Sequence, residues 1–554
     1  MGIHVIQSQR IDVLVHGVLS TLGQPAVHPL EVLKTQHFVV PTPAIEQWLT
    51  QKMAEEQGIS ANQLFHQRIR GFQWYAYQQV LADKDKVRKA NIPRLIMKWR
   101  VYQALGPFIE AEKLQLDQQH PLYPIICRIY DTAEGLEPGI IRQLKKQGML
   151  YWVAEQVSSL FSNYMVYRGY CTKKGCTEVC RCPTNWLKAW GNNQPLDIEA
   201  LFYTTGTEIS VFTLNQAHEL EGWQRWLWQE VFHEDFELMQ EIDAEFWQQL
   251  EQEATRKQAL KRLPQQLVVF TLLDLPPIQL QFLRRLGQYI DVFILHYNPS
   301  QEYWADSVDP VWKKRYDLRV KERFISKNPQ ATDADIKKFF EDFTLHFNAE
   351  VRESRHPLLT RFGKQARDHF SLLSSLSSGE EGQWVDAFVD EFPDNLLGKL
   401  QSDILYLAEP QKHRYPLNAT DDSIQIHVCH SSLRQLEVLK DQLTYWLSQS
   451  SKDQQRRPSD VLVLVPNLKE LEPLIRSVFA VAPKYGISST DSNIFQAANR
   501  ERQVHLPIKI AGVAQLDASN AWRAVLERIQ LVRGRFTLQE FSDWLNLTAT
   551  QQCY

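Results

Sequence analysis

At 554 residues the chain should form more than one domain, and we expect about three or four compact units. It is 44% hydrophobic and 23% charged with a formal net charge of -4, the composition of an ordinary soluble globular protein. This charge neither favours nor excludes nucleic acid, because phosphate binding depends on how charges are arranged locally. No apolar run approaches the roughly 18–20 residues that span a bilayer, the start lacks signal-peptide order, and seven cysteines do not make a disulfide scaffold. We therefore expect a cytoplasmic protein.

The first 60 residues predict two strands, each followed by a helix. Alternating residues at 4–7 predict a short edge strand before a helix from Arg10 to about Leu22. A second strand is expected at His37–Val40, followed by a turn and a helix that contains Ile45, Trp48 and Leu49. Residues from about 62 to 260 are then expected to be mainly helical.

A second strand–helix–strand pattern spans Leu267–Pro299. Leu267–Leu273 predicts an apolar strand and Asp291–Tyr297 the next one. The helix between them is expected to start at Leu275-Pro276-Pro277, because the N–H that proline lacks is not needed in the first turn.

A third such pattern covers 423–466, after a predicted boundary in the polar stretch 409–422. Alternation at 424–428 predicts a half-buried strand, and the spacing of apolar residues from Leu433 to Trp446 predicts a helix capped by Ser431 or Ser432. The fully apolar run Val461–Val465 predicts a strand covered on both faces, as in a parallel sheet. The fold class predicted from these patterns is α/β.

Residues 423–443 (SIQIHVCHSSLRQLEVLKDQL) also resemble RecC, the gamma subunit of exodeoxyribonuclease V. The string is long and idiosyncratic, which makes chance a poor explanation. Further segments resemble the same family, namely 47–49, 160–168, 275–277, 298–304, 356–364, 388–390 and 394–397.

The resemblance implies an inactive superfamily-1 helicase-like fold with parallel-sheet cores and a large helical insertion. The first helicase-like domain would cover 1–415, with its α/β core at 1–60 and 260–415 and the helical insertion at 60–260. The second helicase-like domain would begin at 416 and run to 554. RecC proteins are about twice as long, so the resemblance implies their N-terminal half.

The resemblance further implies a non-catalytic subunit of a RecBCD-type helicase–nuclease that processes double-strand DNA breaks for homologous recombination. Its partners would be RecB-like and RecD-like subunits, double-stranded DNA ends and single-stranded DNA, with ATP and Mg²⁺ used by the partner subunits and no cofactor in this chain. Its role would be to split the duplex, channel the strands and scan single-stranded DNA for a Chi-like sequence. The alternative is a protein-interaction scaffold that reads no sequence.

The motifs of a motor are missing from the sequence. A helicase motor needs a glycine-rich loop that ends in Gly-Lys-Ser/Thr to hold phosphates and Mg²⁺. The two Gly-Lys pairs, Gly363-Lys364 and Gly398-Lys399, are followed by Gln365 and Leu400 and lack the upstream glycine. We therefore expect this chain to carry neither ATPase nor nuclease sites.

Two segments contain metal-ligand residue types. His233–Glu237 lacks the second histidine of a zinc protease pair, and an exposed helix face is the better interpretation. Cys171, Cys176, Cys180 and Cys182 place four thiols within 12 residues, but their spacing is not that of paired CxxC knuckles. A surface loop is favoured over a zinc site, and we predict no metal.

Two sets of residues are candidates for DNA binding. Lys313, Lys314 and Arg315 lie between Trp312 and Tyr316, where cations can neutralise phosphates while rings stack on bases; a solvated basic helix is an equal interpretation. By the resemblance, Gln47, Trp74 and Leu160 match positions of the single-stranded DNA site that reads Chi.

This chain departs from the family pattern around that second set of residues. The family segment Gln-Ser-Thr-Gly is replaced by residues 41–44 (PTPA), acidic residues near Leu160 by Ser159 and Ser162, and a DNA-contacting arginine by Asp243. From the sequence alone, Trp48 and Trp74 are expected to be core aromatics.

Overall fold

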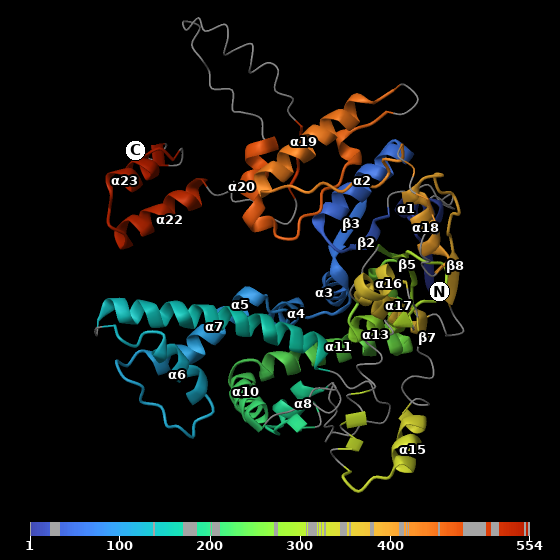
Figure 1. The fold of residues 1–554 in the computed structure, drawn as a ribbon. Helices are drawn as coiled ribbons and strands as arrows, with labels where there is room; N and C mark the ends of the chain where they lie inside the picture. The colour runs from blue at the N-terminus through green and yellow to red at the C-terminus, as the bar shows by residue number, and fades with distance from the viewer. Residues whose placement is uncertain are drawn as a thin grey trace, which may run out of the picture. The chain divides into compact units, whose positions relative to one another are not determined.

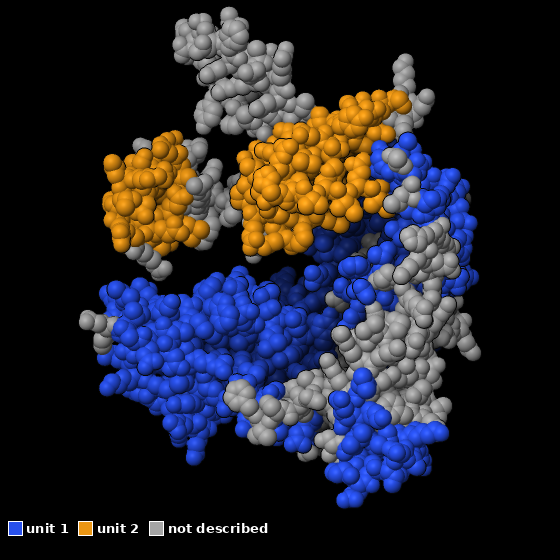
Figure 2. Space-filling view, in the orientation of Figure 1, with its two compact units in different colours: residues 1–423 blue, residues 424–554 orange. Residues whose placement is uncertain are grey.

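The computed structural model divides the chain into two compact units, residues 1–423 and 424–554 (Figures 1 and 2). The structure describes residues 2–22, 34–136, 139–169, 185–199, 201, 211–270, 275–305, 307–308, 318, 321–322, 324–325, 328–343, 352–353, 356–376, 382–408, 415–416, 418, 420–451, 455–479, 506–510, 520–547 and 550–551.

The first unit is built on a six-stranded sheet in the order β3-β2-β4-β5-β1-β8, and every ladder in it is parallel. The sheet and the predicted α/β class are thereby confirmed. The strands are β1 (Gly2–Ser8), β2 (Gln36–Val40), β3 (Gln63–Gln67), β4 (Gln266–Phe270), β5 (Asp291–Tyr297) and β8 (Gly382–Asp386).

Two predictions about this sheet were wrong. β1 is not an edge strand, because it pairs with β5 on one side and β8 on the other. Its polar residues suggested an edge strand, but they have partners inside the protein. The His4 ring, for example, stacks on Phe293 at 4.9 Å between centroids. β3 was missed altogether, because its sequence Gln63–Gln67 contains only two apolar residues and lies on the open edge beside β2.

Both faces of the sheet are covered. Strand residues alternate between two apolar clusters: Phe38 and Val40 face one, whereas Val39 faces the other. The first cluster is covered by α1 (Ile11–Leu22) and α2 (Pro43–Gln57). The second is covered by α3 (Arg68–Val80), α4 (Lys84–Ala90), α11 (His233–Glu251), α12 (Glu253–Arg262), α13 (Pro277–Leu286) and α17 (Lys364–Leu376).

A helical layer with a separate core lies between β3 and β4 in the sequence. Its core contains Trp190, Trp228 and Phe161, all buried to 1% exposure or less. The predicted helical character of this region is confirmed from α3 onward. Its further elements are α5 (Arg94–Leu105), η2 (Gly106–Ile109), α6 (Tyr123–Asp131), α7 (Ile140–Tyr167), α8 (Trp186–Gly191) and α10 (Val211–Val231).

Near the carboxyl ends of β1, β5 and β8, Trp304, Leu359, Phe370 and Leu407 form a small apolar cluster. The remaining elements of the first unit are β6 (Ser307–Val308), α15 (Asp333–Phe343), β7 (Arg352–Glu353), α16 (Pro357–Phe362) and α18 (Leu396–Leu405).

The second unit confirms one predicted helix and contradicts two predicted strands. α19 (Ser432–Ser448) begins as expected, because the Ser431 hydroxyl accepts the N–H of Arg434 at 3.2 Å. Residues 424–428 and 461–465 are not assigned to strands, and Leu462 and Leu464 are 82% and 83% exposed rather than covered on both faces. The physical reason is the lack of neighbouring strands and of a covering layer within residues 420–451, 455–479 and 506–510. The other elements are η4 (Pro458–Asp460), α20 (Leu468–Phe479), α22 (Asn520–Arg533) and α23 (Leu538–Leu545).

Among the described residues, no helix combines the length and apolar character needed to cross a membrane.

Candidate functional site

Trp74 lies on α3 and is buried, as the sequence predicts for a core aromatic. It is 6% exposed, and its ring meets Tyr77 edge-on at 5.4 Å between centroids. The Tyr77 hydroxyl donates to Asp243, which also accepts Trp247 Nε1–H at 3.1 Å. Asp243 is therefore a structural acceptor that joins α3 to α11. The buried Trp74 ring offers little surface on which a base can stack.

Gln47 lies on α2, in the layer on the other face of the sheet, and its side chain is exposed. The departure from the family pattern before it has a local role: Thr42 caps the helix by accepting the N–H of Ile45 at 3.4 Å, and Pro43 occupies the first turn. Because α2 and α3 pack against opposite faces of the sheet, the structure does not bring Gln47 and Trp74 into one layer.

Leu160 is partly buried on α7, in the helical layer, with Ser159 and Ser162 also partly buried beside it. The binding roles of Gln47, Trp74 and Leu160 remain predictions. Lys313, Lys314, Arg315 and Cys171–Cys182 lie outside the described residues.

His233–Glu237 opens α11 and has no arrangement of metal ligands. His233 pairs with Glu237 at 3.4 Å, Asp235 pairs with Arg100, and Phe236 is buried in the core. Burial raises the pKa of Asp235 despite the neighbouring Arg100 guanidinium. Within the part of the chain that the structure describes, no three His, Cys, Asp or Glu side chains converge to hold a metal ion.

The carboxyl edge of the parallel sheet, where open α/β folds bind ligands, is filled on one side by the protein's own polar groups. Gln7 Nε2 donates to Asp386 at 2.6 Å, and Gln7 Oε1 accepts Asn298 Nδ2 at 2.9 Å. Trp304 Nε1 in turn donates to Asn298 Oδ1 at 2.9 Å. Gln7, Asn298 and Trp304 are each at most 3% exposed, so this network links β1, β5 and β8 and leaves no open phosphate cradle there. The sequence analysis missed it, although polar residues at the ends of apolar strands were a usable signal.

The two Gly-Lys pairs have structural roles. Gly363 ends α16, where an added Cβ would lie 3.0 Å from the Trp304 ring. Gly398 lies in the first turn of α18 and donates its N–H to Asn395 Oδ1 at 2.8 Å, while Lys399 pairs with Asp394 at 2.9 Å. Neither pair belongs to a phosphate-binding loop.

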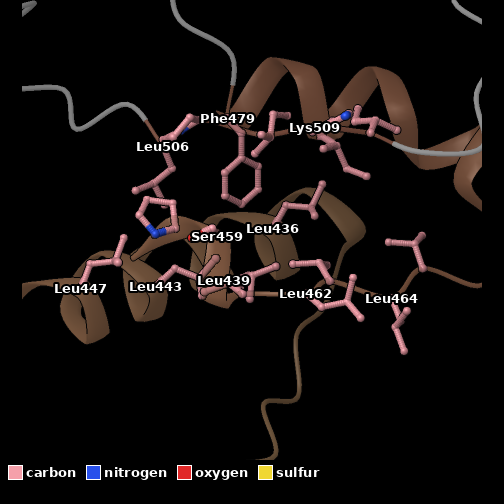
Figure 3. Close-up of a pocket in the computed structure, with 18 of the residues that line it drawn as sticks. Leu436, Leu439, Leu443, Leu447, Ser459, Leu462, Leu464, Phe479, Leu506 and Lys509 are labelled. Carbon is pink, nitrogen blue, oxygen red and sulfur yellow. The ribbon is translucent and has the colours of Figure 1, made fainter. Parts of the chain in front are cut away.

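The second unit contains an apolar cavity of about 710 Å³ (Figure 3). Its walls are Leu436, Leu439 and Leu443 of α19, residues of α20, and the extended segments 461–465 and 506–510. Ser459 and Lys509 are its polar lining residues. Such a lining offers packing surface rather than groups for acid–base or metal chemistry.

The molecule is thus an α/β protein with a parallel sheet, a large helical layer and a sheet edge closed by its own side chains. The family described as "RecC, N-terminal domain" matches residues 3–407, and the chain belongs to that family.

Relatives from several bacteria support this membership. The chain is similar to RecBCD enzyme subunit RecC of Escherichia coli (27% identical over 499 residues, 87% of this chain and 38% of the relative) and of Haemophilus influenzae (27% over 506 residues, 87% and 40%). It is also similar to that of Mycolicibacterium smegmatis (24% over 546 residues, 98% and 40%). The chain thus spans about two fifths of the length of these relatives.

Proposed function

We propose that this chain acts in a RecBCD-type helicase–nuclease that processes double-strand DNA breaks for homologous recombination, as a non-catalytic DNA-binding and scaffold component. The family match over residues 3–407 carries the proposal, since its relatives are named as RecBCD subunits. The partners are RecB-like and RecD-like subunits, which supply ATP and Mg²⁺ chemistry, and DNA with duplex and single-stranded parts.

The proposed mechanism builds on the resemblance, which implies a helicase-like fold that has lost its motor chemistry. The sheet edge filled by Gln7, Asn298 and Asp386, together with the missing phosphate loop, supports a chain that positions DNA rather than hydrolysing nucleotide. In this proposal the protein splits the duplex, channels the strands to its partners and scans one strand for a Chi-like sequence, with Gln47 on the exposed side of α2 as the residue proposed to contact a base edge.

The experiment uses full-length protein purified with RecB-like and RecD-like subunits and titrated against forked DNA. Affinity should fall roughly tenfold between about 50 and 200 mM salt for every two phosphates that the complex neutralises. Gln47→Ala should move the positions at which the complex pauses or cuts. Gln51→Ala is the matched control, because Gln51 lies one turn further along α2 and is also exposed.

Each result separates the candidate functions. Assembly with DNA processing unchanged by Gln47→Ala would favour the second candidate, a scaffold without sequence reading, for which the burial of Trp74 is the favouring observation. Failure of the wild-type chain to assemble with either partner would overturn the proposal.

A further inference from the structure

A second part of the sheet's carboxyl edge carries a cavity of about 490 Å³, which we call the α17 cavity. It lies at the end of β5, because His369, one of its lining residues, places its ring 5.3 Å from that of His296, the penultimate residue of this strand. Gln7, Asn298 and Trp304, which fill the other part of this edge, do not line it. The cavity therefore lies where open parallel sheets bind ligands, and its volume is within the range of ligand sites.

The floor of the α17 cavity belongs to the protein core. Leu275 and His369 line it and are only 2% and 3% exposed. α17, which carries His369, is anchored by Phe370 in the small apolar cluster and by Leu373 in the core of the sheet. α17 also packs against α13 (Figure 1). The floor is thus built by the fold and does not depend on a ligand.

The mouth of the cavity carries Phe362, Lys364 and Gln365. Phe362 is the last residue of α16 and Lys364 the first of α17, so Gly363 alone separates the two helices. A Cβ on Gly363 would lie 2.5 Å from the carbonyl oxygen of Leu359, so this close junction requires glycine. The junction leaves the Phe362 side chain 82% exposed and leaves Lys364 and Gln365 exposed at the same opening.

The charges at the mouth favour a single phosphate. Lys364 is exposed and forms no ion pair within the part of the chain that the structure describes. Asp368 also lines the cavity, but its charge is offset by the Arg367 guanidinium at 3.1 Å. The first turn of α17, a helix of 13 residues, adds the partial positive charge of a helix N-terminus. One lysine without a glycine-rich loop suits one phosphate rather than the three of a nucleoside triphosphate.

The residue types at the mouth match the parts of a nucleotide whose base is unpaired. An exposed phenylalanine ring offers a face on which any base can stack. The amide of Gln365 presents a donor and an acceptor to a base edge, and the Lys364 ammonium suits the phosphate. An apolar peptide side chain would use the Phe362 ring but would leave the other two groups without a partner.

We propose that the α17 cavity holds one unpaired nucleotide of single-stranded DNA, with its base stacked on Phe362, its base edge at Gln365 and its phosphate at Lys364. The inference rests on the proposed function in one respect, that the protein meets unpaired DNA.

The test measures the affinity of full-length protein for a fluorescent oligothymidine of about eight nucleotides, because so short a strand makes few other contacts that could hide the loss of one. Phe362→Ala and Phe362→Leu should each weaken binding about 5- to 100-fold, whereas Phe362→Trp should bind like the wild type. All three should keep the wild-type unfolding midpoint, because the side chain is exposed.

The phosphate contact has its own measurement. Lys364→Gln should reduce the slope of log affinity against log salt by about 0.7, whereas Lys364→Arg should not. Lys89→Gln is the matched control, because Lys89 is exposed on α4 and does not line the cavity.

A cross-link tests the site in the assembled complex. A strand that carries 5-iododeoxyuridine should cross-link on irradiation to the peptide that contains Phe362. Undiminished binding by Phe362→Ala, or no such cross-link in an active complex, would overturn the inference while leaving the proposed function standing. Wild-type affinity of Phe362→Leu would indicate a peptide ligand, and competition by ATP that Lys364→Gln abolishes would indicate a free nucleotide; either result overturns it. If the wild-type protein neither binds DNA nor assembles with its partners, the proposed function fails and this inference fails with it.

Discussion

Two apolar segments of similar composition differ in burial: one is enclosed in the core and the other is largely exposed to solvent. Leu267–Phe270 of β4 is buried to 3% exposure or less, with strands on both sides and helices on both faces. Val461–Val465 contains only aliphatic residues, yet Leu462 and Leu464 are more than 80% exposed. An apolar sequence favours burial, but whether the segment is buried depends on the strands and helices that surround it.

The largest expected effect comes from placing the same charge in each run. Val269→Asp buries a carboxylate without a partner in the first unit and should lower the free energy of unfolding by at least about 4 kcal/mol. Leu464→Asp should change the free energy of unfolding of the second unit by no more than about 0.5 kcal/mol, because the Leu464 side chain already faces solvent. Urea denaturation followed by tryptophan fluorescence and far-ultraviolet circular dichroism measures both. Equal effects of the two substitutions would show that the two side chains are equally buried.

The second prediction tests whether Trp74 is a core residue or part of a binding surface. Trp74→Ala should cost about 3–5 kcal/mol, because it leaves a cavity beside Tyr77 in the core. Gln47→Ala should cost less than about 0.5 kcal/mol, because Gln47 is exposed. Denaturant midpoints of the two variants measure the difference, and a Trp74→Ala protein of wild-type stability would contradict the core assignment.

Much of the first unit could be predicted from the sequence, because its local patterns agree with their surroundings. Asp291–Tyr297 was predicted with the bounds that the structure gives β5, and Ser431 caps α19 as expected. β3 was missed because an edge strand needs few apolar residues. The prediction of strands at 424–428 and 461–465 was wrong, because a short-range sequence pattern does not show whether neighbouring strands are present.

The candidate site was harder to predict, because function depends on which side chains meet. Trp74 and Gln47 were named together from the resemblance, yet they lie on helices that cover opposite faces of the sheet. The partnership of Gln7 with Asn298 joins residues 291 positions apart, and no spacing rule connects them.

The third prediction concerns the buried hydrogen bonds among Gln7, Asn298 and Trp304, which fill the carboxyl edge of the sheet. Asn298→Ala should cost about 2 kcal/mol, because Gln7 Oε1 and Trp304 Nε1 would lose their partner while remaining buried. Asn163→Ala, at an exposed position of α7, is the control and should have little effect. Thermal unfolding of the two variants compares them, and equal midpoints would mean that water or a local shift replaces the lost bonds.

The last prediction tests the burial of His66 by pH. His66 is 8% exposed, and burial together with the neighbouring His37 lowers its pKa to about 4. Between the ordinary value of 6.5 and about 4 the unfolded chain binds a proton that the folded chain does not, so the free energy of unfolding must fall as pH falls through this window. His66→Gln keeps a polar partner for His37, whose Nδ1 lies 3.1 Å from His66 Nε2. Denaturant titrations at pH 7, 5.5 and 4.5 should give a shallower loss of stability for His66→Gln than for the wild type. Because all carboxyl groups titrate alike in both proteins, parallel curves would show that His66 is hydrated in the folded protein and that this edge of the sheet is less enclosed than β4.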